Sequence, residues 1–235
     1  SRAPIVPAAP APDNRCYHST RATQAGTMNH WIERWQNGRT GWHETDGNAG
    51  LREHWRFDAQ QVLVPLCGKS PDLRWLAEQG HSVTGVELSD IAIRDFFSEQ
   101  GLGFTVDEAG SHEAYHCKEL PITLYRGDYF EFNGGPFDAL YDRGALVAVD
   151  PGERTRYVAH TRRLLSADAK LLLVTLEYDQ DIVAGPPFAL MPDVVNSSFA
   201  GLERVSEQVD LENCPPKFRD AGLTEILEVV WVSSG

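Results

Sequence analysis

The stretch from Gln61 to Glu87, QVLVPLCGKSPDLRWLAEQGHSVTGVE, constrains the fold more than any other part of the sequence. Gln61–Leu66 is a valine-containing apolar run that is too short for a helix, so it predicts a buried parallel strand. Gly68 then allows a sharp turn of the backbone. The following residues predict a helix that has Ser70 as its N-cap, a proline in its first position and Gly80 just past its end.

Ser82–Val86 predicts a second strand, and Glu87 stands at its carboxyl end. This order of elements is the first half of a nucleotide-binding βαβ unit, in which such a carboxylate accepts hydrogen bonds from ribose hydroxyls. GxGxxG is absent, and Lys69 and Pro71 leave little bare backbone for a pyrophosphate. The pattern therefore favours a nucleoside ligand without phosphates, of which S-adenosylmethionine is the common one; the alternative is that Glu87 is only a solvated acid at a strand end.

Length and charge limit the functions that this chain can have. Its 235 residues suit a single domain with a sizeable core, which we assign to residues 28–235. The formal net charge of -13 argues against nucleic acid as a partner, because phosphates would be repelled. No apolar run is long enough to span a membrane, so no membrane partner is expected.

The first 27 residues differ from the rest in being rich in proline and alanine and poor in acids. We interpret residues 1–27 as a flexible leader, which a tag, a linker or an organelle-targeting segment would each explain. The four cysteines are widely spaced and form no CxxC pair, so neither a zinc site nor a disulfide framework is indicated. A cytoplasmic protein with reduced thiols is expected, with organelle targeting left open.

The remaining elements are predicted from periodicity and turn residues. A helix is expected after Ser89 or Asp90, followed by a short strand at Phe104–Val106 and a polar surface excursion at Asp107–Glu119. Further strands are expected at Ile122–Tyr125, Phe137–Tyr141 and Lys170–Leu176, with a helix capped by Asp150-Pro151 before the last of them. The C-terminal tail is expected to close an antiparallel edge of the sheet.

Four tryptophans gather ahead of the first strand: Trp31, Trp35, Trp42 and Trp55. An indole face attracts a sulfonium or ammonium group by about 0.5–2 kcal/mol, so they predict an aromatic wall over a bound cation. The alternative is a packing lid over the sheet edge. His43, alone in its loop, is expected to form hydrogen bonds rather than to act as a base.

Two further positions follow predicted strands. The Gly127–Asp128–Tyr129 turn offers an acid and an aromatic ring to an adenine, although an ordinary β-turn is an equal alternative. Asp142 and Arg143 stand where open α/β sheets bind ligands. No metal site is expected, because His112, His116 and Cys117 have no second cluster to complete a tetrahedron.

With these pieces in place, the sequence resembles the thiopurine S-methyltransferase family. The matching segments are WIERWQNGRTGWH, VLVPLCGKSPDLRWLAEQGHSVTGVELS, IRDFFSEQ, FDALYDRGALVAVDPGERTRY and GPPF. The resemblance implies an α/β Rossmann-like methyltransferase fold: a mostly parallel seven-stranded sheet with helices on both faces and a reversed, antiparallel last strand. It also implies S-adenosylmethionine as cofactor, S-adenosylhomocysteine as product, and a small-molecule soft nucleophile as methyl acceptor.

The resemblance also implies roles for individual residues. The positions that match the cofactor site are Trp31, Trp35, Trp42, Leu66, Gly68, Glu87, Gly127, Asp128, Tyr129 and Arg143. Those expected to face the acceptor are Trp42, Arg143, Phe188 in the GPPF loop, and Lys217. Arg143 and Asp142 are expected to position the reactants.

The expected chemistry needs little from the protein, because the sulfonium methyl is already activated and aromatic thiols ionise readily. Neither Asp142 nor His43 is therefore expected to be an essential base, and orientation should supply much of the rate. The acceptor is left open between a thiol, a thiopurine-like aromatic thiol, a selenium or tellurium species and a halide. A nicotinamide-dependent oxidoreductase and a non-catalytic nucleoside-binding module are the alternatives. A monomer is expected.

Overall fold

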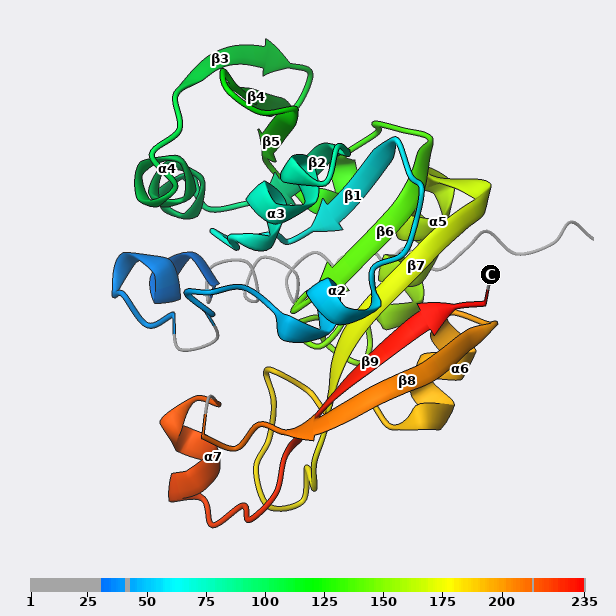
Figure 1. The fold of residues 1–235 in the computed structure, drawn as a ribbon. Coiled ribbons are helices and arrows are strands. Elements are labelled where there is room, and N and C mark those ends of the chain that lie inside the picture. Colours follow the sequence, from blue (N-terminus) through cyan, green and yellow to red (C-terminus); the bar gives the residue numbers. More distant parts are fainter. Residues whose placement is uncertain (1–30, 41–42, 213, 235) are drawn as a thin grey trace, which may run out of the picture.

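The computed structural model describes residues 31–40, 43–212 and 214–234, which share one nine-stranded sheet in the order β3-β4-β5-β2-β1-β6-β7-β9-β8 (Figure 1). The strands are β1 Gln61–Pro65, β2 Ser82–Glu87, β3 Phe104–Ala109, β4 His112–Cys117, β5 Ile122–Arg126, β6 Phe137–Arg143, β7 Leu165–Glu177, β8 Leu202–Val209 and β9 Leu227–Ser233. The helices are α2 Ala49–His54, α3 Asp72–Glu78, α4 Asp90–Glu99, α5 Arg154–Leu164, α6 Pro192–Ser198 and α7 Pro216–Asp220, with a 3-10 turn η1 at Tyr129–Glu131. Residues 31–36 are also helical.

The predicted Rossmann-like methyltransferase fold is confirmed in the order and direction of its strands. β5, β2, β1, β6 and β7 pair in parallel, and β9 lies antiparallel between β7 and β8. These seven strands are the expected core with a reversed last strand.

The sheet has nine strands rather than seven, because β3 and β4 form an antiparallel hairpin beside β5. The prediction of a surface excursion over Asp107–Glu119 was therefore wrong. The segment looks polar in sequence, yet His112, Ala114 and Tyr115 are buried once β4 pairs with β5.

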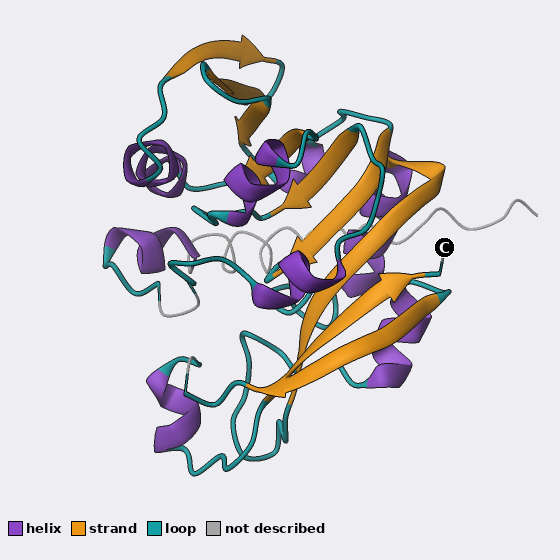
Figure 2. Ribbon diagram, viewed as in Figure 1, coloured by secondary structure: helices purple, strands orange, loops and turns teal. Residues whose placement is uncertain are grey.

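Helices cover both faces of the sheet (Figure 2). Alternate residues of β1 enter different cores, since Val62 and Val64 pack with α3 and α4, whereas Leu63 packs on the side of α5 and α6. The sheet is thus buried on both faces, as continuous apolar strands predict. None of the helices described is long and apolar enough to cross a membrane.

The predicted Ser89 N-cap of α4 is confirmed, since Ser89 Oγ accepts the Ala92 N–H at 3.3 Å, but two other helices begin later than predicted. Gly80 follows α3 with a φ of +98°, as expected of a residue that ends a helix. α3 itself begins at Asp72, and Ser70 Oγ accepts the Asp72 N–H at 3.2 Å. α5 begins at Arg154 rather than beside Asp150, because the Asp150 side chain accepts the Gly152 N–H at 2.8 Å and so closes a turn ahead of the helix.

Candidate active site

A cavity of about 640 Å³ lies at the carboxyl edge of the parallel strands. Its wall is formed by the helix at residues 31–36, the loop before α2, the β1–α3 turn, the ends of β2 and β6, the turn after β5, and residues near the ends of β7, β8 and β9. Its volume is typical of small-molecule sites, which span roughly 300–1,000 Å³. This is the edge at which open α/β sheets bind ligands.

The β1–α3 turn forms one end of the cavity in an uncommon backbone conformation. Leu66 has a φ of +47° and Gly68 a φ of +55°. A Cβ on Gly68 would lie 3.3 Å from Trp35 Cζ2, so a side chain there would crowd the indole as well as strain the backbone. A left-handed leucine is rare and costs free energy, and such residues cluster at functional sites.

Glu87 crosses from the tip of β2 to this turn. Its Oε2 accepts the Gly68 N–H at 2.9 Å, and its Oε1 accepts the Ser89 N–H at 2.8 Å. The side chain lines the cavity, although the residue is only 8% exposed. Burial raises the pKa of Glu87, while the backbone N–H groups oppose that shift. Each oxygen keeps a further lone pair for a ligand hydroxyl.

The turn after β5 supplies Gly127, Asp128 and Tyr129 to the same cavity. A Cβ on Gly127 would lie 2.3 Å from the His112 ring, so only glycine fits there without a rearrangement. His112 Nε2 lies 3.0 Å from the Asp128 carbonyl oxygen, and Tyr129 Oη lies 2.9 Å from Thr161 Oγ1. The hairpin and α5 therefore fix this turn from two sides.

Of the predicted aromatic wall, Trp31 and Trp35 line the cavity, and Trp42 lies outside the described residues. The Arg34 guanidinium lies 5.4 Å from the Trp31 ring centroid, which shows that this indole accepts a cation on its face. Trp55 is a core residue that donates its indole N–H to His81 Nε2 at 2.9 Å.

Arg143, at the end of β6, divides the cavity between the turn and the C-terminal strands. It forms an ion pair with Glu44. Burial works against the charge of Arg143, but Glu44 and other acidic groups outweigh it and raise the pKa of the guanidinium. Burial raises the pKa of Glu44, which the Arg143 charge opposes.

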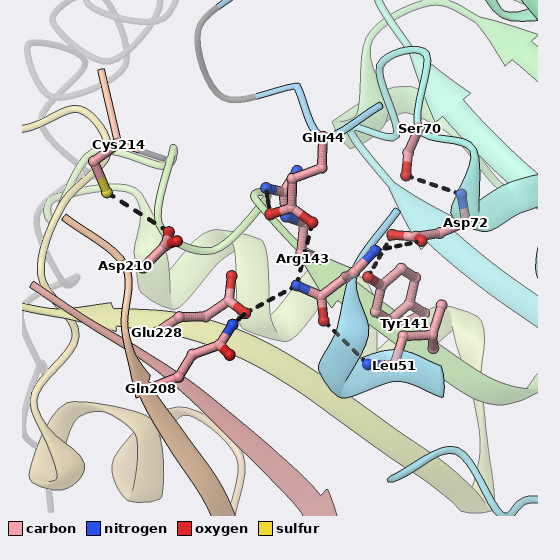
Figure 3. Close-up of polar contacts among 11 residues, drawn as sticks. Glu44, Leu51, Ser70, Asp72, Tyr141, Arg143, Gln208, Asp210, Cys214 and Glu228 are labelled. Atoms are coloured by element: carbon pink, nitrogen blue, oxygen red, sulfur yellow. Dashed lines mark hydrogen bonds and ion pairs between the residues drawn. The ribbon is translucent and has the colours of Figure 1, made fainter. Parts of the chain in front are cut away.

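The far end of the cavity contains two separate groups of hydrogen-bonded polar side chains (Figure 3). Glu228 Oε1 accepts hydrogen bonds from Asn48 Nδ2 at 3.0 Å and from Gln208 Nε2 at 3.1 Å. Cys214 Sγ lies 3.8 Å from Asp210 Oδ2. Burial, with Asp210 next to it, raises the pKa of Cys214 to about 12, so its thiol is neutral and unreactive at physiological pH.

The family model of thiopurine S-methyltransferase matches residues 26–235. The chain belongs to the thiopurine S-methyltransferase family. It is an S-adenosylmethionine-dependent methyltransferase of that family, and its methyl acceptor is a small molecule.

Relatives agree with that assignment. The thiopurine S-methyltransferase of Bordetella petrii is 40% identical over 210 residues, which are 86% of this chain and 95% of the relative. That of Aliivibrio salmonicida is 42% identical over 207 residues, covering 86% and 96%.

Among solved structures, the Burkholderia thailandensis 1,6-didemethyltoxoflavin N1-methyltransferase, bound to 1,6-didemethyltoxoflavin and S-adenosylhomocysteine, has a TM-score of 0.58 at 20% identity, covering 99% of this chain and 95% of that one. An arsenic(III) methyltransferase from Chlamydomonas reinhardtii has a TM-score of 0.52 at 13% identity, covering 84% and 73%. At these identities the likeness shows the fold alone.

The donor set of the cavity suits S-adenosylmethionine better than a phosphorylated cofactor. At one end it offers a buried carboxylate, a crowded glycine turn and indole faces, and Lys69 there forms an ion pair with Glu99 at 2.6 Å. Among the described residues, no group of three or more histidine, cysteine or acidic side chains is placed to hold a metal ion.

Three of the predicted site residues do not line the cavity. Asp142 is 1% exposed, and it accepts the Tyr157 O–H at 2.6 Å and the Leu146 N–H at 3.0 Å. The ring of Phe188 lies under the Arg154 guanidinium at 5.6 Å. Lys217 Nζ donates to the carbonyl oxygens of Ala184 at 3.0 Å and Pro186 at 2.7 Å. Each of them supports the wall from behind.

The sequence analysis missed the polar residues of the far end. These are Glu44, Asn48, Gln208, Asp210 and Glu228. Glu44 and Asn48 lie in a turn-rich loop without periodicity, so nothing local marked them. The one available signal was Glu228, a carboxylate within the otherwise apolar strand LEVVW.

Proposed function

We propose that this chain transfers the methyl group of S-adenosylmethionine to a sulfur atom of a thiopurine-like aromatic small molecule. The observation that carries the proposal is that one cavity joins a nucleoside-type end, with Glu87 and the Gly68 turn, to a second polar end beside β9. Two ligands therefore have room to meet near Arg143.

At the nucleoside-type end, Glu87 would accept the ribose hydroxyls, and the Gly127–Tyr129 turn would hold the adenine. Trp31, Trp35 and Leu66 would enclose the methionine part of the cofactor. Arg143, held by Glu44, would face both reactants. Contact of Trp42 with both the cofactor and the acceptor stays a prediction.

The cofactor supplies an activated methyl group on a sulfonium, so the protein has to orient the acceptor and exclude water. Well-oriented intramolecular reactions gain about 7–11 kcal/mol from orientation, which gives the scale available to such an enzyme. No general base is needed for a thiol that ionises readily. Burial, with Lys69 and Arg143 nearby, lowers the pKa of His43, which favours its neutral form.

A monomer stays a prediction. Cys67, Cys117 and Cys214 are free, which suits a reducing compartment such as the cytoplasm.

The test is a thermal-shift titration with S-adenosylmethionine, S-adenosylhomocysteine and NAD, followed by a methyl-transfer assay on thiophenol and 6-mercaptopurine. A ligand at about 100 times its Kd stabilises the folded state by about 2.7 kcal/mol, which is a measurable shift. Stabilisation by both adenosyl compounds with S-methylated product is the expected result. Binding without turnover of any thiol, but with turnover of a halide or a selenium compound, would refute the proposed acceptor class.

A further inference from the structure

Glu228 is a buried carboxylate that the protein satisfies on one side only. It lies near the start of β9, is 4% exposed and lines the cavity. Asn48 and Gln208 both donate to its Oε1. Its Oε2 accepts no hydrogen bond from any residue that the structure describes. In Figure 3 the second oxygen of Glu228 points away from the two amides.

Because Oε2 opens on the cavity, it can accept a hydrogen bond from water or from a ligand there, whereas Oε1 is already used by the protein. A ligand that brings an N–H or O–H group to that oxygen replaces such a water. Asn48 and Gln208 also fix the carboxylate in place, so its orientation is set before a ligand arrives.

The surroundings give this end of the cavity a negative character. Its described lining includes the carboxylates of Glu44, Asp210 and Glu228 and the guanidinium of Arg143, and the Arg34 guanidinium lines the same cavity. Arg143 already forms an ion pair with Glu44. A carboxylate on the acceptor would meet like charges here, and an amino group would meet opposite ones.

We propose that Glu228 determines acceptor specificity by accepting a hydrogen bond from a nitrogen-borne proton of the acceptor. The enzyme accordingly prefers aromatic thiols that carry an amino or ammonium group to those that carry a carboxylate. This inference rests on the proposed function, since it describes the acceptor end of the same cavity.

The decisive variant is Glu228→Gln. Its amide oxygen can still accept from Asn48 and Gln208, while its NH₂ group replaces the acceptor that faces the cavity by a donor. The probes are thiophenol, 4-(aminomethyl)thiophenol and 4-mercaptobenzoate, each assayed for kcat/KM at saturating S-adenosylmethionine. Because each thiol is compared between two proteins, differences in intrinsic nucleophilicity cancel.

In the wild type we expect the amino compound to be favoured over the carboxylate, and in Glu228→Gln we expect that ratio to fall by roughly tenfold or more, the scale of one hydrogen bond to a charged group. Thiophenol and the KM of S-adenosylmethionine should change by less than about threefold, because neither uses this oxygen. Glu203→Gln, on the neighbouring strand β8 and outside the cavity, makes the same change in net charge and should leave the ratio unaltered.

A second experiment measures binding and needs no turnover. With S-adenosylhomocysteine bound, benzylamine should stabilise the wild type against heat more than benzoate does, and Glu228→Gln should remove the difference. An unchanged amine-to-carboxylate ratio in the variant, or equal use and binding of both in the wild type, overturns the inference. If no thiol is methylated but benzylamine is still preferred through Glu228, the proposed S-methyl transfer fails and this inference is supported.

Discussion

At the scale of single residues, Glu87 is the residue on which the proposed cofactor site most depends. Its carboxylate bonds the backbone on both sides of the cavity end, through Gly68 and Ser89. Glu87→Ala should raise the KM of S-adenosylmethionine by roughly ten- to a hundredfold, the scale of a hydrogen bond to a charged group, and lower kcat much less. Initial rates with the cofactor varied test this. Glu78→Ala, an exposed acid on α3, is the control; a fall confined to kcat would contradict the assigned role.

Asp142 follows a predicted strand end but does not line the cavity, so we expect it to stabilise the fold rather than take part in the reaction. Both of its oxygens are used, by Tyr157 and Leu146. Burial raises the pKa of its carboxyl, with those hydrogen bonds opposing the shift. Asp142→Ala should lower the free energy of unfolding by about 1–3 kcal/mol, because the buried Tyr157 hydroxyl loses its acceptor.

At temperatures well below unfolding, the kcat of Asp142→Ala at saturating substrates should stay within a few-fold of wild type, and Asp142→Asn should restore most of the stability. Urea unfolding and steady-state kinetics measure the two effects separately. Loss of most activity with an intact fold and normal cofactor affinity would mean that Asp142 takes part in the reaction.

At the scale of elements, α7 and the loop before α6 form a wall behind the acceptor end. Lys217 on α7 bonds the carbonyl oxygens of Ala184 and Pro186, and Tyr178 donates its O–H to Pro187 at 2.6 Å. Lys217→Met should therefore raise the KM of the acceptor several-fold and leave that of the cofactor unchanged. Lys217→Arg should restore part of the loss, and Lys170→Met is a control on β7. Equal changes for both substrates would show that Lys217 serves general stability instead.

The elements that the sequence predicted well are those whose own residues determine them. β1, α3 and β2 follow from an apolar run, a glycine stop and a strand-end acid within one short stretch. The β3–β4 hairpin was missed because its burial depends on β5, which follows it in the chain. The start of α5 was misplaced for a related reason. Asp150 could cap either a helix or the turn ahead of it, and the sequence alone does not distinguish the two.

At the scale of the whole molecule, the two ends of the cavity differ in how far the sequence could predict them. The described residues that were predicted to bind the cofactor line one cavity, and their role there stays a prediction. The acceptor end joins Asn48 to Glu228, which are 180 positions apart, and the contact exists only because β9 inserts beside β7. No local pattern contains that pairing.

The same burial gives the folded protein a characteristic dependence on pH. Burial raises the pKa values of Glu44, Glu87, Asp142 and Glu228. In the range between their ordinary and raised pKa values, the folded state binds more protons than the unfolded state. The contribution of these four groups to stability is therefore greatest below their ordinary pKa values and falls as the pH rises through the raised ones, whereas the lowered pKa values of His43 and His160 make stability rise with pH through their ordinary range. The formal net charge of -13 at pH 7 adds self-repulsion in the same direction as the four acidic groups.

Glu228 should therefore make the ligand-free wild type lose unfolding free energy, relative to Glu228→Gln, between about pH 5.5 and about pH 8. Glu228→Gln should lessen that fall and be more stable than wild type at the higher pH, because it keeps the bonds to Asn48 and Gln208 without a buried charge. Glu203→Gln shares the change in net charge but should keep the full slope, so the pair separates burial from self-repulsion. Urea unfolding at the two pH values measures this, and identical slopes for wild type and Glu228→Gln would contradict it. If Glu228→Gln is more stable than wild type but discriminates less between amino and carboxylate acceptors, then Glu228 serves recognition of the acceptor at the expense of stability.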